Sequence, residues 1–410
     1  MVAFHFPPLA GSSGIQRTLR FAQQLPEFGW EPIVLTADPR AYERTSTDLM
    51  PEISDRIEVA RAFALDAARH LSVRGRYPAL LARPDRWITW RYAAIPAGMR
   101  LIRRHQPHAI WSTYPIATAH VIGARLARRS QLPWIADFRD PMAQPGYPED
   151  PKVWKSFDRI EKRAVGEARF CVFTTPGAAR EYSRRYPLAA DRIKVIENGF
   201  DEESFAAIPA EGPPPRPLHP GAITLLHSGI VYPWERDPTQ LFAAIGRLAE
   251  KGKVRPGELV LRFRAANHDE LLRSLAQRHR IEGFLELLPP ISYRDALLEM
   301  QNADGLLVLQ ASNCNDQIPA KLYEYLRARR PIVALTDPNG DTAGVARAAG
   351  IDTIAPLDSI DEIEALLQRF IAAVRSGQAP LPSPEFVARA SRRARARELA
   401  ALLDRSPAPR

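Results

Sequence analysis

The strongest candidates for chemistry are a lysine and a glutamate three residues apart, Lys321 and Glu324. Pro319 suits the first turn of a helix, which would carry both side chains on one face near its N-terminus. A cation there can bind a phosphate, and a carboxylate can accept hydrogen bonds from ribose hydroxyls. The alternative is a surface ion pair that stabilises the helix by about 0.3 kcal/mol.

A turn with two glycines follows the first predicted strand, residues 2–6, and precedes a predicted helix that ends near Leu25. It contains Gly11 and Gly14, and Arg17 lies just beyond them. Backbone N–H groups in such a turn can bind a phosphate or a sugar hydroxyl. The spacing does not match the G-x-G-x-x-G dinucleotide fingerprint. An equally good interpretation is a tight turn that needs glycine for its positive φ angles.

Two acids lie at the carboxyl end of the predicted strand 134–138, in the sequence Asp137-Phe138-Arg139-Asp140-Pro141. Acids at the carboxyl end of a strand can orient an acceptor hydroxyl or take its proton. Equally, Arg139 and its two flanking acids could form an internal ion-pair cluster that fixes the loop. His120 begins a predicted helix; it could contact a transferred sugar or a leaving phosphate, or it could be a core or capping histidine.

Apolar runs rich in β-branched residues alternate with segments of helical period, which predicts an α/β protein with parallel sheets. The runs form two series on either side of a proline-rich segment. The first series is 2–6, 32–36, 109–113, 134–138, 170–174 and 193–196, and the second is 223–227, 259–263, 284–288, 305–309 and 331–335.

Closely spaced prolines at 209–220 forbid helix and internal strand, so we place the domain boundary there. We predict an N-terminal Rossmann-like domain at 1–205, a linker at 206–221, a C-terminal Rossmann-like domain at 222–380, and a terminal helix and tail at 381–410. Two doubly wound domains would face one cleft, because each open sheet binds ligands at the carboxyl ends of its strands.

The composition, 45% hydrophobic and 25% charged, is that of a globular protein and excludes a disordered chain. No apolar run approaches the roughly 18 residues of a spanning helix, and no leader is recognisable, so we expect a cytoplasmic chain. Two cysteines are too few for a disulfide framework or a metal knuckle. The net charge of +9 suggests an anionic partner: nucleic acid, a lipid surface or a phosphorylated substrate. A genomic bias toward arginine would give the same charge.

Several blocks in order resemble the glycosyltransferase family 4-like group of GT-B sugar transferases. They are FHFPPLAGSSGIQRTLRFAQQLPEFGWEPIVLT, PWIADFRDP, IENGFD, HSG and PAKLYEYLRARRPIVAL, and together they cover nearly the whole chain. The resemblance implies the GT-B fold, with a C-terminal helix that packs back toward the N-terminal domain. It also implies a retaining transferase that needs no metal or other cofactor.

The resemblance places a nucleotide-diphospho-sugar, linked to UDP or GDP, on the C-terminal domain and the acceptor on the N-terminal domain. Gly229 and Arg236 match the family's diphosphate-binding segment. Lys321 and Glu324 stand in its donor block, where Asp316 replaces the earlier glutamate of the family's E-x7-E pattern. The resemblance further implies a front-face reaction in which the leaving phosphate helps to deprotonate the acceptor.

Residues 61–105 contain ten arginines, two acids and five aromatic residues. Arginine interleaved with tryptophan and tyrosine suits an anionic membrane interface, which predicts a peripheral protein on the inner face of the plasma membrane. The alternative is a helix that covers the N-terminal sheet and turns its arginines to solvent.

The sequence therefore predicts a metal-independent hexosyltransferase that moves a sugar to a glycan or lipid-linked acceptor, in cell-surface or exopolysaccharide synthesis. One alternative is another GT-B enzyme, such as a sugar-nucleotide 2-epimerase, which would share the donor half. A basic nucleic-acid-binding protein is a third class, but the chain has no zinc finger, RNP aromatic pair or basic-region heptad, and we expect no nucleic-acid partner.

Overall fold

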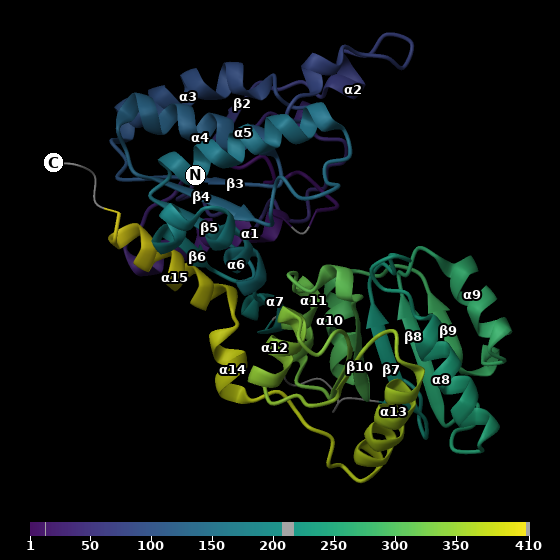
Figure 1. Ribbon diagram of the computed structural model, residues 1–410. Helices are drawn as coiled ribbons and strands as arrows, with labels where there is room; N and C mark the ends of the chain where they lie inside the picture. The colour runs from purple at the N-terminus through teal and green to yellow at the C-terminus, as the bar shows by residue number, and fades with distance from the viewer. Residues whose placement is uncertain (13, 207–216, 407–410) are drawn as a thin grey trace. The chain divides into compact units, whose positions relative to one another are not determined.

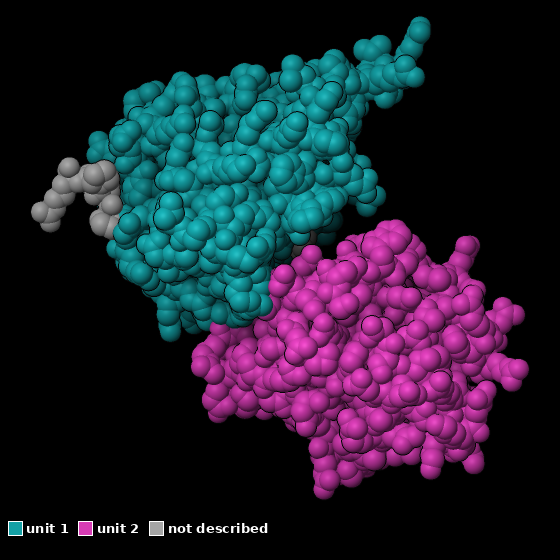
Figure 2. Space-filling model, in the orientation of Figure 1, with its two compact units in different colours: residues 1–198, 392–410 teal, residues 199–391 magenta. Residues whose placement is uncertain are grey.

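The computed structural model describes residues 1–12, 14–206 and 217–406, and the chain forms two compact units (Figures 1 and 2). Unit 1 comprises residues 1–198 and 392–410, and unit 2 comprises residues 199–391. The chain passes into unit 2 a few residues before the predicted end of the first domain. Most of the predicted linker lies outside the described residues.

Unit 1 contains a parallel sheet in which the first residues of the chain lie between two groups of strands. Val2 forms parallel bridges to Leu35 on one side and to Ser112 on the other. The order is thus β2, β1, the Val2 segment, β3, β4, β5, β6. The strands are β1 (Ile33–Ala37), β2 (Glu58–Ala62), β3 (Ile110–Thr113), β4 (Trp134–Arg139), β5 (Phe170–Phe173) and β6 (Ile193–Val195).

Helices cover both faces of this sheet, because the buried strands present apolar side chains on both sides. One face packs against α3 (Trp90–His105), α4 (Ala117–Ser130), α5 (Pro151–Glu167) and α6 (Pro176–Arg185). The other packs against α1 (Gly14–Gln24) and α15 (Arg392–Asp404). The short helix α2 (Ala67–His70) precedes α3.

Unit 2 has a six-stranded parallel sheet of order β12-β11-β10-β7-β8-β9. Numbered within the unit, this is the doubly wound order 3-2-1-4-5-6, whose switch point lies between β7 and β10. The strands are β7 (Ile223–Ser228), β8 (Leu259–Arg264), β9 (Leu285–Leu288), β10 (Gly305–Leu309), β11 (Ile332–Leu335) and β12 (Ile354–Ala355).

The helices of unit 2 also form two layers. The first contains α8 (Thr239–Glu250), α9 (Asp269–Arg278) and α13 (Ile360–Arg375). The second contains α7 (Glu202–Ala206), α10 (Tyr293–Asn302), α11 (Ala320–Ala328), α12 (Asp341–Ala348) and α14 (Pro384–Arg389). Serine side chains cap the N-termini of three of them, α10, α13 and α14, by accepting from backbone N–H groups.

The terminal helix returns to unit 1, as the sequence predicts. Leu399 and Leu403 of α15 belong to the cluster that buries Phe21 and Trp111. Arg395 of α15 donates to Glu197 at 2.6 Å and to the carbonyl oxygen of Asn198. The single terminal helix predicted within 381–410 is divided into α14 and α15, which belong to different units.

We expect Leu399→Ala to lower the free energy of unfolding of unit 1 by about 2–5 kcal/mol, because the deleted side chain leaves a cavity in the core. Leu399 is 1% exposed, whereas Leu188 of the same unit is 98% exposed. Leu188→Ala is the matched control and should change stability by less than about 0.5 kcal/mol. Calorimetric unfolding measures both, and equal stability of the two variants would contradict the packing of α15.

Candidate functional site

The carboxyl edge of the unit 2 sheet brings together three of the predicted donor-binding residues. Gly229 follows β7 directly, Arg236 lies in the loop beyond it, and Lys321 lies on α11 after β10. These segments lie at the switch point between β7 and β10, where doubly wound sheets bind ligands.

Gly229 lets the Lys321 ammonium come close to the backbone. Its φ is +122°, and a Cβ atom built on it would lie 2.7 Å from Lys321 Nζ. A side chain at this position would therefore collide with the ammonium, and the backbone conformation itself favours glycine. The positive φ therefore favours glycine here, and a side chain would push the flexible end of Lys321 away from its present position.

The pKa of Lys321 is lower than that of an exposed lysine. Desolvation and the neighbouring charge of Arg236 lower its pKa to about 7, against the opposing effect of Glu324. Arg236 itself donates through Nη1 to the carbonyl oxygen of Ile230 at 2.6 Å and stacks over the ring of Tyr232. The two cations thus share one site, and their mutual repulsion would be relieved by a bound anion.

A buried histidine supports the lysine. His227, at the end of β7, is 0% exposed, and its Nε2 lies 3.2 Å from Lys321 Nζ. Its Nδ1 lies 2.9 Å from the carbonyl oxygen of Leu307 on β10. Sequence reasoning placed this histidine in the HSG block without giving it a role.

The two remaining donor-side candidates lie on either side of the start of α11. Glu324 is half-buried, and its Oε1 accepts a hydrogen bond from the hydroxyl of Tyr293 at 2.8 Å. Asp316 is exposed in the loop before α11. The structure therefore places Glu324 one helical turn beyond Lys321, and it supplies Tyr293 as a partner that no sequence motif indicated.

The acceptor-side acids of unit 1 have opposite environments. Asp137 is 0% exposed, and its two carboxylate oxygens accept from Arg17 Nη2 at 2.8 Å and Arg17 Nε at 2.9 Å. Thr113 also donates to it, and Arg17 donates to the carbonyl oxygens of Ile196 and Glu197. Arg17 and Asp137 thus form a buried fork that joins α1 to the sheet.

Asp140 is exposed to solvent, yet the protein atoms around its carboxyl raise its pKa, while the charge of Arg139 acts in the opposite direction. Arg139, the residue before Asp140, has a φ of +63°, and the pairing of β4 with β5 is irregular between Asp137 and Arg139. A non-glycine residue in this region is strained, and such strain concentrates at functional sites. Of the two predicted acids, Asp140 is the one that solvent can reach.

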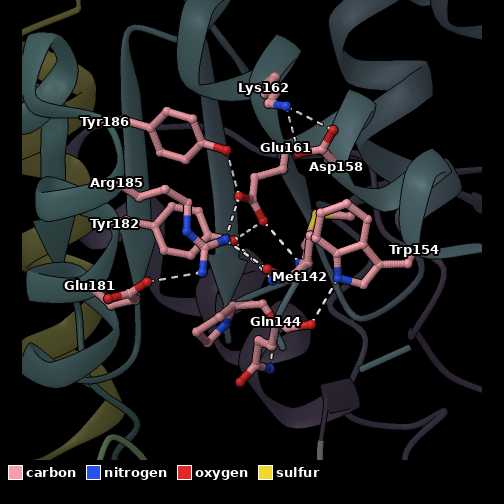
Figure 3. Close-up of polar contacts among 12 residues, drawn as sticks. Met142, Gln144, Trp154, Asp158, Glu161, Lys162, Glu181, Tyr182, Arg185 and Tyr186 are labelled. Atoms are coloured by element: carbon pink, nitrogen blue, oxygen red, sulfur yellow. Dashed lines mark hydrogen bonds and ion pairs between the residues drawn. The ribbon is translucent and has the colours of Figure 1, made fainter. Parts of the chain in front are cut away.

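A buried carboxylate holds the loop that follows Asp140 (Figure 3). Glu161 of α5 is 0% exposed and accepts four hydrogen bonds, from Ala143 N, Arg185 Nη1 and the hydroxyls of Tyr182 and Tyr186. The hydroxyl of Tyr182 in turn accepts from Met142 N at 2.9 Å. The loop after β4 is therefore tied to both α5 and α6.

The two glycines of the turn differ in their surroundings. Gly11 has a φ of +79° and no atom near its would-be Cβ, so it serves the turn. At Gly14 a Cβ would lie 2.6 Å from Arg139 Nη1 and 2.7 Å from His5 Nδ1. Gly14 thus permits the close approach of two basic side chains to the start of α1.

His120 lies in the core of unit 1. It is 0% exposed, its Nδ1 lies 2.8 Å from the hydroxyl of Ser112, and its ring packs near Trp134 and Phe138. Burial lowers its pKa to about 4, so the ring is neutral at neutral pH. Among the described residues, its Nε2 has no hydrogen-bond partner.

Within the described ranges, no three histidine, cysteine or acidic side chains group in a way that could hold a metal ion. A separate search of those ranges finds no helix both long and apolar enough to cross a bilayer.

Comparison with known proteins gives a family match for the first unit: residues 13–199 match the glycosyl transferase 4-like domain. This match spans most of unit 1. No curated protein sequence matches the chain.

Solved structures resemble the whole chain. Anabaena HepE in complex with UDP has 14% identity and a TM-score of 0.63, over 98% of this chain and 99% of that one. A glycosyltransferase from Rickettsia africae has 12% identity and a TM-score of 0.65, over 98% of each chain. The lipopolysaccharide galactosyltransferase WaaB has 12% identity and a TM-score of 0.61, over 98% of each chain. Similarity at these identities shows the fold, which is the GT-B glycosyltransferase fold, and it confirms the predicted architecture.

The roles of Asp137 and Asp140 in unit 1 can be separated by mutation. Asp137→Asn should cost about 3–5 kcal/mol of stability, because it leaves the buried Arg17 without its counter-charge. Asp140→Asn should cost less than about 1 kcal/mol, as expected for an exposed charge. Calorimetric unfolding of both variants tests this, and an unchanged melting temperature for Asp137→Asn would contradict the structural role of the fork.

Proposed function

We propose that this protein transfers a sugar from a nucleotide-diphospho-sugar to an acceptor hydroxyl, with retention of configuration. The observation that carries the proposal is the pair of cations, Lys321 and Arg236, at the switch point of the unit 2 sheet. Gly229 lies beside Lys321 and has no side chain that would separate its backbone from the site.

The chemistry explains why two cations are useful there. Transfer breaks the bond between the anomeric carbon and a phosphate oxygen, so negative charge develops on the leaving diphosphate. Preorganised positive groups stabilise that charge without further rearrangement. Arg236 can fork onto two phosphate oxygens, and Lys321 can donate to a third. In this proposal these side chains supply the positive charge, and no metal ion is required.

The donor is most simply a UDP-sugar, with a GDP-sugar as the second option. Anabaena HepE is described in complexes with UDP and with UDP-glucose, and it shares the fold over nearly the full length. Glu324 would accept hydrogen bonds from the ribose hydroxyls, one helical turn from the phosphate-binding Lys321. Asp316 would lie on the donor-sugar side, as the family resemblance implies.

The acceptor would bind to unit 1, near Asp140 and the turn with Gly14. The acceptor hydroxyl oxygen attacks the anomeric carbon on the face that the phosphate leaves, and its proton passes to a phosphate oxygen. This front-face course needs no protein nucleophile. We propose a glycan or a lipid-linked glycan as acceptor and cell-surface or exopolysaccharide synthesis as the pathway.

A lipid-linked acceptor agrees with a basic arm on unit 1, residues 69–83, which begins at the end of α2 and projects from the body of the unit (Figure 1). Val73 and Leu80 of the arm are each 75% exposed. The arm contains four arginines and no acid, and its tight turn has positive φ angles at Arg74 and Gly75. Exposed apolar side chains among arginines suit an anionic lipid surface, so we propose peripheral membrane binding here.

Lys321→Ala and Glu324→Ala should each weaken UDP binding about tenfold to hundredfold, the loss expected for hydrogen bonds to charged groups. Lys253→Ala is the matched control, because Lys253 is an exposed lysine of the same unit. Calorimetric titration with UDP measures binding, and circular dichroism checks the fold. Unchanged affinity in both site variants would move the donor site elsewhere, and mass spectrometry of products from a donor screen would separate transfer from epimerisation.

The paired change Val73→Asp and Leu80→Asp should abolish binding to vesicles that contain anionic lipid, because it places charge where the apolar contacts would form. Leu188→Asp is the control, since this side chain is fully exposed on the same unit but outside the arm. Co-sedimentation with anionic and neutral vesicles measures the effect. Wild-type protein that shows no preference for anionic vesicles would remove the membrane proposal.

A further inference from the structure

We propose that His227 is a positioning residue: it accepts a hydrogen bond from Lys321 and so holds the ammonium beside Gly229, ready for a diphosphate. This inference rests on the proposed function, because it concerns the same site.

The tautomer of His227 follows from its partners. The carbonyl oxygen of Leu307 lies 2.9 Å from Nδ1, and the carbonyl oxygen of Ile230 also interacts with the ring. Because a carbonyl oxygen can only accept, we assign the ring proton to Nδ1, which leaves Nε2 to accept from Lys321 Nζ at 3.2 Å. Burial and the charge of Lys321 keep the pKa of His227 well below its usual range, so the ring stays neutral. A neutral acceptor can hold an ammonium without cancelling its charge.

The position of His227 is set by the sheet. The residue lies in β7, which pairs with β8 on one side and β10 on the other, and its Nδ1 partner is in β10. The ring also packs near Phe263 of β8, with centroids 5.6 Å apart. The acceptor atom is therefore fixed by three adjacent strands, whereas the lysine stem has several rotatable bonds. Lys321 is the flexible partner that needs positioning.

The desolvated position of Lys321 beside Arg236 predicts that diphosphate binding takes up a proton. Lys321 is faced by His227 from β7, by Arg236 from the loop after β7 and by Glu324 from its own helix. Its pKa of about 7 leaves it partly neutral in the empty site, and a bound dianion would raise that pKa. Affinity for UDP should then fall as the pH rises above about 7, by up to tenfold per pH unit.

The test is a double-mutant cycle with UDP as the probe, measured by calorimetry between about pH 7 and pH 9, where the phosphate is ionised. His227→Phe keeps a ring but removes the acceptor, and it should weaken binding about tenfold and shift the pH dependence. In a Lys321→Ala background the same change should alter affinity less than about twofold, because its effect passes through the lysine.

Thr224→Val is the matched control, since Thr224 is a fully buried polar residue of the same strand, three residues before His227. It should leave UDP affinity and proton uptake unchanged. Should His227→Phe fail to fold, nitrogen NMR of the wild-type imidazole decides the matter. A protonated Nδ1 and a bare Nε2 that responds to UDP support the proposal, and a protonated Nε2 overturns it.

Two failures can be told apart. Wild-type protein that binds no UDP and no GDP would overturn the proposed function. Wild-type protein that binds UDP, and loses it with Lys321→Ala but not with His227→Phe, would overturn only the role of His227. Equal effects of His227→Phe with and without Lys321 would likewise show that the histidine acts on the fold and not through the lysine.

Discussion

The electrostatic repulsion between two cations, Lys321 and Arg236, is the interaction on which the arrangement of the unit 2 site depends. Their repulsion, added to desolvation, lowers the pKa of Lys321. Each is held by a neutral acceptor, Nε2 of His227 for the lysine and the carbonyl oxygen of Ile230 for the arginine. A bound anion would relieve this repulsion, so the site favours dense negative charge.

The fold could be predicted where the strands are buried on both faces. Runs such as 305–309 and 331–335 are continuously apolar because helices cover both sides of the sheet, and the structure has strands there. Two edge strands were missed. β2 has the sequence EVARA and is only partly buried, and β12 has two residues, so neither leaves an apolar run. The predicted strand 2–6 enters the sheet only through Val2.

From the residues alone, contacts in the site could be predicted only between residues that are close in the sequence. The three-residue spacing of Lys321 and Glu324 puts both on α11, and the structure has that helix. Nothing local reveals that Arg17 reaches Asp137, 120 positions away, or that His227 meets a lysine 94 positions away. Such pairs depend on strand order, because parallel strands bring distant carboxyl ends to one edge. Local sequence therefore indicates which residue types lie near the site, and the strand order determines which of them are in contact.

The two buried histidines show how partners decide roles. His120 and His227 are both 0% exposed, both have a lowered pKa, and both engage Nδ1 in a hydrogen bond. They differ in what lies at Nε2. Aromatic rings pack around His120, whereas a lysine lies at Nε2 of His227. A neutral imidazole stabilises a cation only where one is present, so the same side chain serves packing in unit 1 and charge placement in unit 2.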